Sequence, residues 1–143
     1  MTYTTLNVKH DGAIDWLCLN RPQRLNAINP PMCDELQHYF DSLQRNNAVR
    51  VVILHGTGRA FCAGYDLKDA DRVSAGPVAG MNVQRQVSEV FLRMRRCPQP
   101  IICLAHGATT GGGFAFALAS DIRIVARDVR MNVAMVKVGL TGC

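Results

Sequence analysis

The feature that most constrains the fold is the stretch HGATTGGGFAFALASD, residues 106–121. Three consecutive glycines are followed by seven uncharged residues before Asp121. A helix over 113–120 would have no polar face, so it must be covered on every side. Its first turn would carry no side chain capable of chemistry, but its first backbone N–H groups would lack partners within the helix. The sequence therefore predicts a buried helix whose backbone, rather than its side chains, is available for function.

Composition and charge limit the classes of function. The chain has 143 residues, the size of one domain, with 16 Lys and Arg against 11 Asp and Glu. The net charge of +5 is too small and too scattered to predict nucleic-acid binding. The one basic run, RMRR at 93–96, closes an expected helix, where cations suit the helix dipole. Six cysteines form no CxxC pair and the histidines have no zinc spacing, so we expect no metal site and free, mostly buried thiols.

Residues 97–120 carry no formal charge and are long enough to cross a bilayer. Pro98, Pro100, His106 and several glycines interrupt the run, so a buried strand, a loop and a buried helix explain it better. The first residues, MTYTTLNVKHDG, lack the apolar run of a signal peptide. These observations predict no membrane span and a cytoplasmic location.

The elements alternate between short strands and helices. Asp11-Gly12 predicts a hairpin turn, and Asn29 followed by Pro30 predicts a helix start. Residues 72–80 are small and polar and predict a mobile segment. The further expected elements are strands at 50–55, 100–105 and 122–127 and a helix over 83–94. This order predicts an α/β fold with right-handed crossovers and largely parallel strands.

Two loops share a design. RAFCAGYDL (59–67) follows the expected strand at 50–55, and HGATTGGGF (106–114) follows the one at 100–105. Open α/β folds bind ligands at the carboxyl ends of their strands. Small residues let a ligand approach the backbone, and N–H groups from the two loops could converge on one oxygen as an oxyanion hole. For one loop alone, glycines that only permit close helix packing would be the simpler explanation; the pair favours the ligand site.

These loops resemble the crotonase superfamily, the enoyl-CoA hydratase/isomerase fold. The matching pieces are LNRPQRLNAI, GTGRAFCAGYDL, PQPIICLAHGATTGGGFAFALASDIRIVAR and VKVGL, which together cover about residues 14–140. The resemblance implies a spiral of repeated ββα units with short, largely parallel sheets. It also implies a homotrimer or hexamer, and it makes residues 1–143 a crotonase-like core that resembles the amino-terminal half of longer family members.

The resemblance also implies a ligand, an acyl-CoA or enoyl-CoA thioester, and no separate cofactor because CoA is part of the substrate. The backbone N–H groups of Ala63 and Gly112 would hold the thioester oxygen. The residues implied to contact the ligand are Arg24 and Leu25 at its adenine and phosphate end, and Ala63, Gly64, Tyr65, Asp66, Gly111 and Gly112 along the rest.

The chain departs from the family where hydratases carry their two glutamates. Ala115 stands at the first position and Met135 at the second. The only glutamates, Glu35 and Glu89, fall on expected amphipathic helices, and we expect them on the solvent side. Asp66 and Asp121 flank the two loops, and we expect them to brace a loop and a strand start rather than to act as general bases.

Two functions remain open. One is a crotonase-type enzyme that stabilises a thioester enolate and catalyses isomerisation, hydrolysis or carbon–carbon cleavage rather than two-glutamate hydration. The other is a non-catalytic acyl-CoA binder or oligomer partner. A nucleotide-binding domain is a more distant third, because the strand–glycine–helix context is right but no GxGxxG motif is present.

Overall fold

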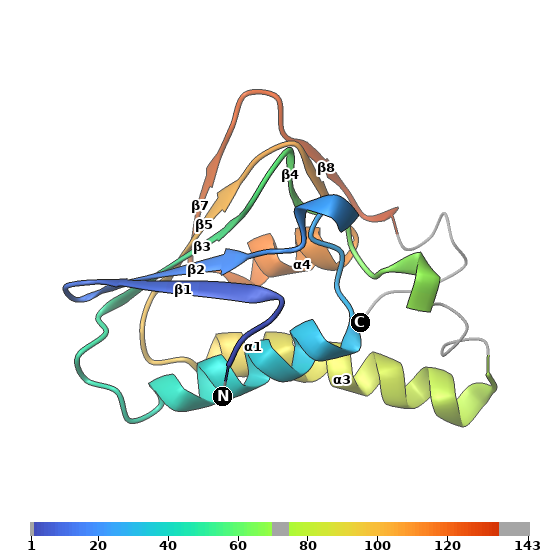
Figure 1. Cartoon of the computed structure of the whole chain (residues 1–143), viewed down its shortest axis with the longest axis horizontal. Helices are drawn as coiled ribbons and strands as arrows, with labels where there is room; N and C mark the ends of the chain where they lie inside the picture. Colours follow the sequence, from blue (N-terminus) through green and yellow to red (C-terminus); the bar gives the residue numbers. More distant parts are fainter. Residues whose placement is uncertain (1, 70–74, 135–143) are drawn as a thin grey trace.

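The computed structural model describes residues 2–69 and 75–134. Its strands form two sheets (Figure 1). The larger sheet has the order β1 (Leu6–Asp11), β2 (Ile14–Leu19), β3 (Val51–Gly56), β5 (Ile101–Ala105), β7 (Ile122–Val125). The smaller has the order β4 (Ala60–Cys62), β6 (Ala108–Thr110), β8 (Arg130–Asn132). The helices are α1 (Pro30–Leu43), α3 (Pro77–Arg96) and α4 (Gly112–Ala119), with single 3-10 turns η1 (Pro22–Arg24) and η2 (Leu67–Asp69).

The chain repeats a ββα unit. β3, β4 and α3 form one unit and β5, β6 and α4 the next, after which β7 and β8 begin a third. The first strand of each pair joins the larger sheet and the second joins the smaller sheet. Apart from the antiparallel β1–β2 hairpin, the paired strands are parallel. The prediction of an α/β spiral of ββα units with largely parallel short sheets is confirmed.

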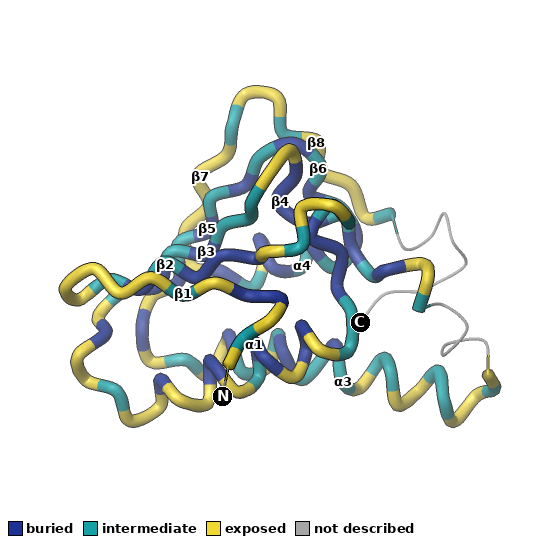
Figure 2. The backbone as a smooth tube through the Cα atoms, in the orientation of Figure 1, coloured by how far each residue is buried: buried dark blue, intermediate teal, exposed yellow. Residues whose placement is uncertain are grey.

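The core lies between the larger sheet and the helices. Asn29 caps α1, because its side chain accepts a hydrogen bond from the Met32 N–H at 3.1 Å. α1 and α3 run side by side below the sheet in Figure 1. α1 carries buried residues along its length, whereas the buried residues of α3 lie in its second half, and its first half is teal and yellow in Figure 2. The basic run at 93–96 closes α3, as expected. No helix within the described ranges is long and apolar enough to cross a membrane.

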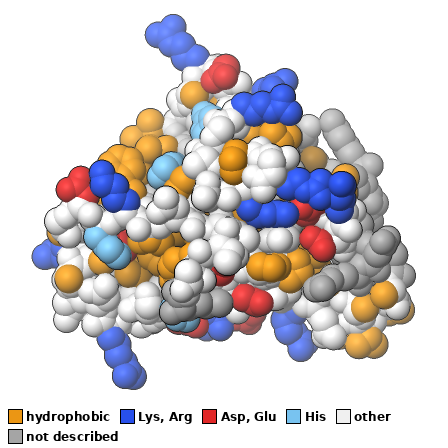
Figure 3. Space-filling view, in the orientation of Figure 1, with side chains coloured by type: hydrophobic (Ala, Val, Ile, Leu, Met, Phe, Trp, Pro, Cys, Tyr) orange, Lys and Arg blue, Asp and Glu red, His pale blue; other side chains and the backbone are white. Residues whose placement is uncertain are grey.

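The other face of the larger sheet carries a second set of apolar side chains. Trp16, Ile53, Ile102 and Ile122 pair in register across four strands and therefore share one face. None of them belongs to the buried core cluster. Exposure is greatest at the edge strand β7, where Ile122 is 51% and Ile124 is 58% exposed. Figure 3 shows hydrophobic side chains gathered over this part of the sheet.

Several expectations were wrong. The three-residue strands β4 and β6 were expected to be loop, and β7 ends at Val125 rather than at 127. Residues 77–80 of the expected mobile segment form the first turn of α3; residues 72–74 lie outside the described residues. Glu35 is buried rather than on the solvent side, at 3% exposure. α4 is covered only in part, because Leu118 is 58% exposed among the described residues.

Candidate functional site

The smaller sheet brings the two small-residue loops together. β4 and β6 are parallel neighbours with Cys62 opposite Thr109, so the segments that follow them leave the same edge of the sheet. A Cβ placed on Gly64 would lie 3.1 Å from the Thr110 carbonyl oxygen and 3.6 Å from the Gly112 nitrogen. The Thr110 hydroxyl donates a hydrogen bond to the Ala63 carbonyl at 2.8 Å. The loops are thus in direct contact, as the ligand-site hypothesis requires, although they follow the short strands rather than the long ones.

Glycine is needed where these loops meet. Gly64 has φ +97° and Gly111 has φ +54°, values that residues with side chains rarely adopt. The Gly111 N–H donates to the Asn132 carbonyl at 2.9 Å, which fixes the start of α4. A Cβ on Gly113 would overlap the Cys62 carbonyl, so this glycine lets the helix pack on β4. Close packing therefore explains Gly113, and the backbone conformation explains Gly64 and Gly111.

The Gly112 N–H is the donor that best fits the predicted role. Gly112 is the first residue of α4, where an N–H has no acceptor within the helix. Among the residues that the structure describes, we find no hydrogen bond from this N–H. The Ile28 side chain packs beside it, because a Cβ on Gly112 would come within 2.5 Å of Ile28 Cδ1.

A third segment, residues 25–28, lies along the loop at 63–66. The Ala63 N–H donates to the Leu25 carbonyl at 3.0 Å, and the Ile28 N–H donates to the Gly64 carbonyl at 2.7 Å. The Asp66 N–H donates to the Ile28 carbonyl at 2.8 Å. The structure thus brings Leu25 beside the predicted ligand loop. It also argues against Ala63 as an oxyanion donor, because its N–H is already used within the fold.

Tyr65 occupies a different position in the same loop. It forms a parallel β-bridge with Ile28, in which Ile28 bonds to Gly64 and Asp66 on either side. In such a bridge the N–H and C=O of the central residue point away from the partner segment. The Tyr65 N–H is therefore directed away from residues 25–28. The sequence could not separate Ala63 from Tyr65, because both lie in the same short loop.

Asp66 is held by two arginines. Its Oδ2 lies 3.0 Å from an Arg21 guanidinium nitrogen and 3.8 Å from Arg24 Nε, and its Oδ1 accepts from the Lys68 N–H at 3.2 Å. Burial alone would raise the pKa of Asp66, but these hydrogen bonds and cations outweigh it and lower the pKa below its ordinary value. This carboxylate is a brace, as expected. Of the two arginines, Arg24 is the more exposed, at 34% of its side chain against 14% for Arg21.

The predicted acid–base positions hold no acid or base. Ala115 lies in the first turn of α4 and donates its N–H to the Gly111 carbonyl at 3.0 Å; Met135 lies outside the described residues. Cys62 is fully buried beside the site, and burial raises the pKa of its thiol to about 12, so it is not a thiolate at neutral pH. Asp121 accepts from the Ile101 N–H at 2.8 Å and pairs with Arg95 at 3.1 Å, the structural role expected of it.

Two polar residues near the site had no predicted role. Arg21 and Asn26 lie in the segment NRPQRLNAI, which was assigned to the ligand only through Arg24 and Leu25. Asn26 is fully buried and hydrogen-bonds to three backbone groups. The signal that could have identified it is its residue type, because asparagine tolerates the left-handed conformation that it adopts here, at φ 53°.

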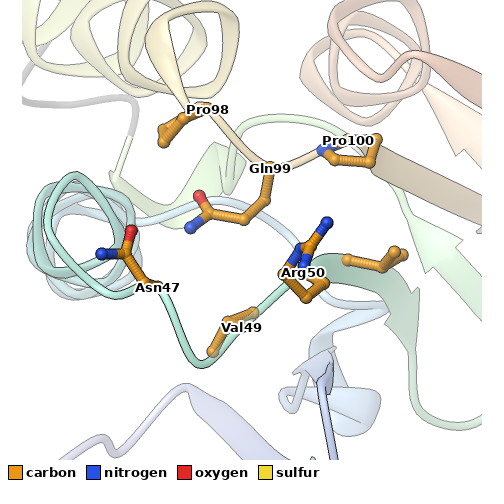
Figure 4. A pocket seen from close by; sticks show the side chains of 7 residues that line it. Asn47, Val49, Arg50, Pro98, Gln99 and Pro100 are labelled. Atoms are coloured by element: carbon orange, nitrogen blue, oxygen red, sulfur yellow. The ribbon is translucent and has the colours of Figure 1, made fainter.

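A separate depression of about 610 Å³ lies at the opposite, amino-terminal ends of β3 and β5 (Figure 4). It is lined by Asn47, Val49, Arg50, Val51, Pro98, Gln99 and Pro100. The Gln99 amide, its central polar group, already donates to the Leu43 and Asn46 carbonyls at 3.1 and 3.0 Å. Within residues 2–69 and 75–134, no three His, Cys, Asp or Glu side chains lie together as a metal site. The two-loop site therefore remains the functional candidate.

With the geometry of the two loops described, comparison with known proteins identifies the family of the chain. The family model for enoyl-CoA hydratase/isomerase matches residues 9–142. The chain belongs to the enoyl-CoA hydratase/isomerase family. It is 39% identical over 126 residues to 1,2-epoxyphenylacetyl-CoA isomerase of Escherichia coli, covering 87% of this chain and 48% of that protein. It is 36% identical over 132 residues to the human mitochondrial Delta(3,5)-Delta(2,4)-dienoyl-CoA isomerase, covering 85% of this chain and 40% of the relative.

Solved structures of the family agree with the fold. The crystal structure of an enoyl-CoA hydratase from Mycobacterium smegmatis superposes with a TM-score of 0.89 at 34% identity, covering 96% of this chain and 53% of that one. The chain thus spans about half the length of the family members that it matches. Both relatives named above are isomerases and the third is a hydratase, so family membership alone leaves the reaction open.

Proposed function

We propose that the chain binds an acyl-CoA or enoyl-CoA thioester and stabilises an enolate-like thioester oxygen with backbone N–H groups from the two loops. The observation that carries this proposal is the contact between Gly64 and the start of α4, which places the Gly112 N–H beside the 63–66 loop. Removing one of two such donors typically raises the activation free energy by about 3–4 kcal/mol.

The two donors in this proposal are Gly112 and Tyr65. Ala63, the sequence-based choice, is replaced because its N–H bonds to Leu25. Tyr65 is two residues further on, and its N–H is directed away from the 25–28 segment. Gly64, Asp66 and Gly111 would then border the ligand through their backbone, and Arg24 and Leu25 would border its adenine and phosphate end.

The reaction proposed is one other than two-glutamate hydration. Ala115 and Met135 stand where the family resemblance places the hydratase glutamates. Glu35 accepts hydrogen bonds from Thr4 and Thr5, and Glu89 pairs with Arg93 at 2.5 Å, so both glutamates are committed elsewhere. Proton transfer by a single base, as in an isomerisation, fits these observations better than the addition of water.

A second candidate is a non-catalytic acyl-CoA binder or oligomer partner. It is favoured by one observation, that Asp66, the carboxylate nearest the loops in sequence, is held by Arg21 and Lys68 at a lowered pKa. The oligomer expected by resemblance, a homotrimer or hexamer in the cytoplasm, belongs to either candidate.

The test combines binding with turnover. Calorimetric titration with acetoacetyl-CoA, whose thioester enolises readily, should show binding, and crotonyl-CoA hydration should be far slower than about 10 per second. Binding without isomerase, hydrolase or hydratase turnover would favour the second candidate. Hydration at ordinary enzyme rates would refute the proposed reaction type, and no binding of any CoA thioester would refute both candidates.

A further inference from the structure

We propose that Arg21 is a positioning residue for the thioester site, a role that rests on the function proposed above. Its guanidinium joins two segments. One nitrogen donates to the Ala27 carbonyl and another lies 3.0 Å from Asp66 Oδ2. The Arg21 and Asp66 side chains are only 14% and 7% exposed, so this clamp is largely shielded from water. A planar fork can make both bonds at once, which a lysine ammonium at the same position cannot do with the same geometry.

The clamp holds a turn that is unfavourable by itself. Leu25 and Asn26 have φ 52° and 53°, and they are the non-glycine residues with positive φ in the described part of the chain. Such conformations persist only where surrounding contacts enforce them. The Arg21 backbone carbonyl accepts from the N–H groups of Arg24 and Asn26, both at 2.9 Å, and the Arg21 guanidinium holds the carbonyl of Ala27, the residue that follows the turn.

The Asn26 side chain completes the support. Its Oδ1 accepts from the Arg21 N–H at 2.8 Å, and its Nδ2 donates to the Thr57 and Ala60 carbonyls at 2.8 and 2.9 Å. Asn26 therefore ties the turn to the residues that lead into β4. Arg21 and Asn26 together fix the turn from both sides.

The turn at Leu25 and Asn26 also fixes the loop at 63–66. The Ala63 N–H donates to the Leu25 carbonyl, and the Ile28 N–H donates to the Gly64 carbonyl. These two bonds set the peptide plane before Ala63 and the peptide plane after Gly64, and the second of these planes carries the Tyr65 N–H. Loosening the Arg21 clamp re-aims that N–H while leaving the Gly112 N–H in place. The effect falls on recognition of the thioester carbonyl rather than on binding of the CoA moiety.

Arg21→Lys tests this, because it keeps the positive charge and removes the fork. The measurement is the ratio of dissociation constants for free CoA and acetoacetyl-CoA, which gives the contribution of the acetoacetyl group, including its thioester carbonyl. Misplacement of a catalytic group by about 1 Å can cost about 100-fold, so we expect the ratio to fall roughly 10-fold or more, with the CoA constant itself changed less than about threefold. Arg93→Lys is the matched control, since Arg93 also pairs with a carboxylate, that of Asp41, but lies on α3.

The outcomes separate the two proposals. If the unmodified protein binds both ligands equally or binds neither, the proposed function fails. If it prefers acetoacetyl-CoA and Arg21→Lys keeps that preference, or weakens both ligands equally, the positioning role is overturned while the proposed function stands. If Arg21→Lys does not fold, Asp66→Asn replaces it, because it removes the charge that pairs with the Arg21 guanidinium. A retained preference in that variant also overturns the role.

Discussion

The two glutamates give the sharpest stability prediction, because one is buried and the other is not. The Glu35 carboxylate accepts four hydrogen bonds of 2.6–2.9 Å from the N–H and hydroxyl groups of Thr4 and Thr5. These bonds fasten the amino-terminal segment to α1. The perturbation is Glu35→Ala, with Glu89→Ala as the matched control, since Glu89 is 40% exposed and pairs with Arg93 on the same helix, α3.

The expected magnitude follows from what is left unpaired. Thr5 is buried, so its two donors lose charged acceptors without gaining water, at about 1–3 kcal/mol each. Thr4 is exposed, and water replaces its lost bonds at little cost. Glu35→Ala should therefore lower the free energy of unfolding by about 3 kcal/mol, a large part of the typical 5–15 kcal/mol. Glu89→Ala should lower it by about 0.5 kcal/mol, as for a surface pair within a helix.

The pH dependence gives a second check on the same variant. Burial alone would raise the pKa of Glu35, but the bonds from Thr5 and Thr4 outweigh it, so the folded pKa is lowered. A lowered folded pKa stabilises the protein above the unfolded value of about 4.3 and this contribution is lost as the pH falls through the folded value. Urea unfolding at pH 7 and pH 3 should show the gap between the parent and Glu35→Ala shrinking at pH 3. A gap below about 1 kcal/mol at pH 7, or one that is equal at both pH values, would refute this account of Glu35.

Three further predictions concern the site and the assembly. Gly112→Pro removes the N–H at a position where proline suits a helix start, so calorimetry should show that acetoacetyl-CoA binds much more weakly. Gly112→Ala keeps the N–H and should weaken binding less. Equal effects of the two substitutions would contradict the donor role. Ala115→Glu with Met135→Glu should raise crotonyl-CoA hydration above the parent, and no gain in a folded variant would count against the assigned positions. Replacing Ile122 and Ile124 by lysine should reduce self-association in sedimentation velocity, and Val78→Lys is the control. If the unmodified protein is already a stable monomer with no dye-accessible apolar surface, this prediction is wrong.

The sequence predicted those features that depend on local chemistry. The Asp11-Gly12 hairpin, the Asn29 cap and the basic end of α3 each follow from residues close in the chain. The strands β4 and β6 were missed because three residues are too few to show a periodic pattern. The burial of Glu35 was missed because its partners lie 30 residues away in a segment without a strong pattern.

Within the candidate site, too, the sequence predicted local features but not contacts between distant segments. The sequence identified both loops, since small residues before a helix start are visible as letters. It could not identify which N–H points where, because the bond from Ala63 to Leu25 joins two backbones and leaves no trace in residue type. Arg21 and Asn26 were passed over for a related reason: their importance comes from a positive-φ turn that only the folded chain reveals.

Three carboxylates of the described chain, those of Asp121, Asp66 and Glu35, are poor candidates for a general base. The Ile101 N–H lowers the pKa of Asp121 and outweighs its burial, with a further contribution from Arg95. Asp66 and Glu35 are held below their ordinary pKa by their own donors, against the opposing effect of burial. A carboxylate with a lowered pKa is a weak base at neutral pH, because the best catalytic base has a pKa near the working pH. In the proposed function, these three acids therefore serve as braces, the Gly112 and Tyr65 N–H groups bear the oxyanion, and proton transfer requires a group other than Asp66, Asp121 or Glu35.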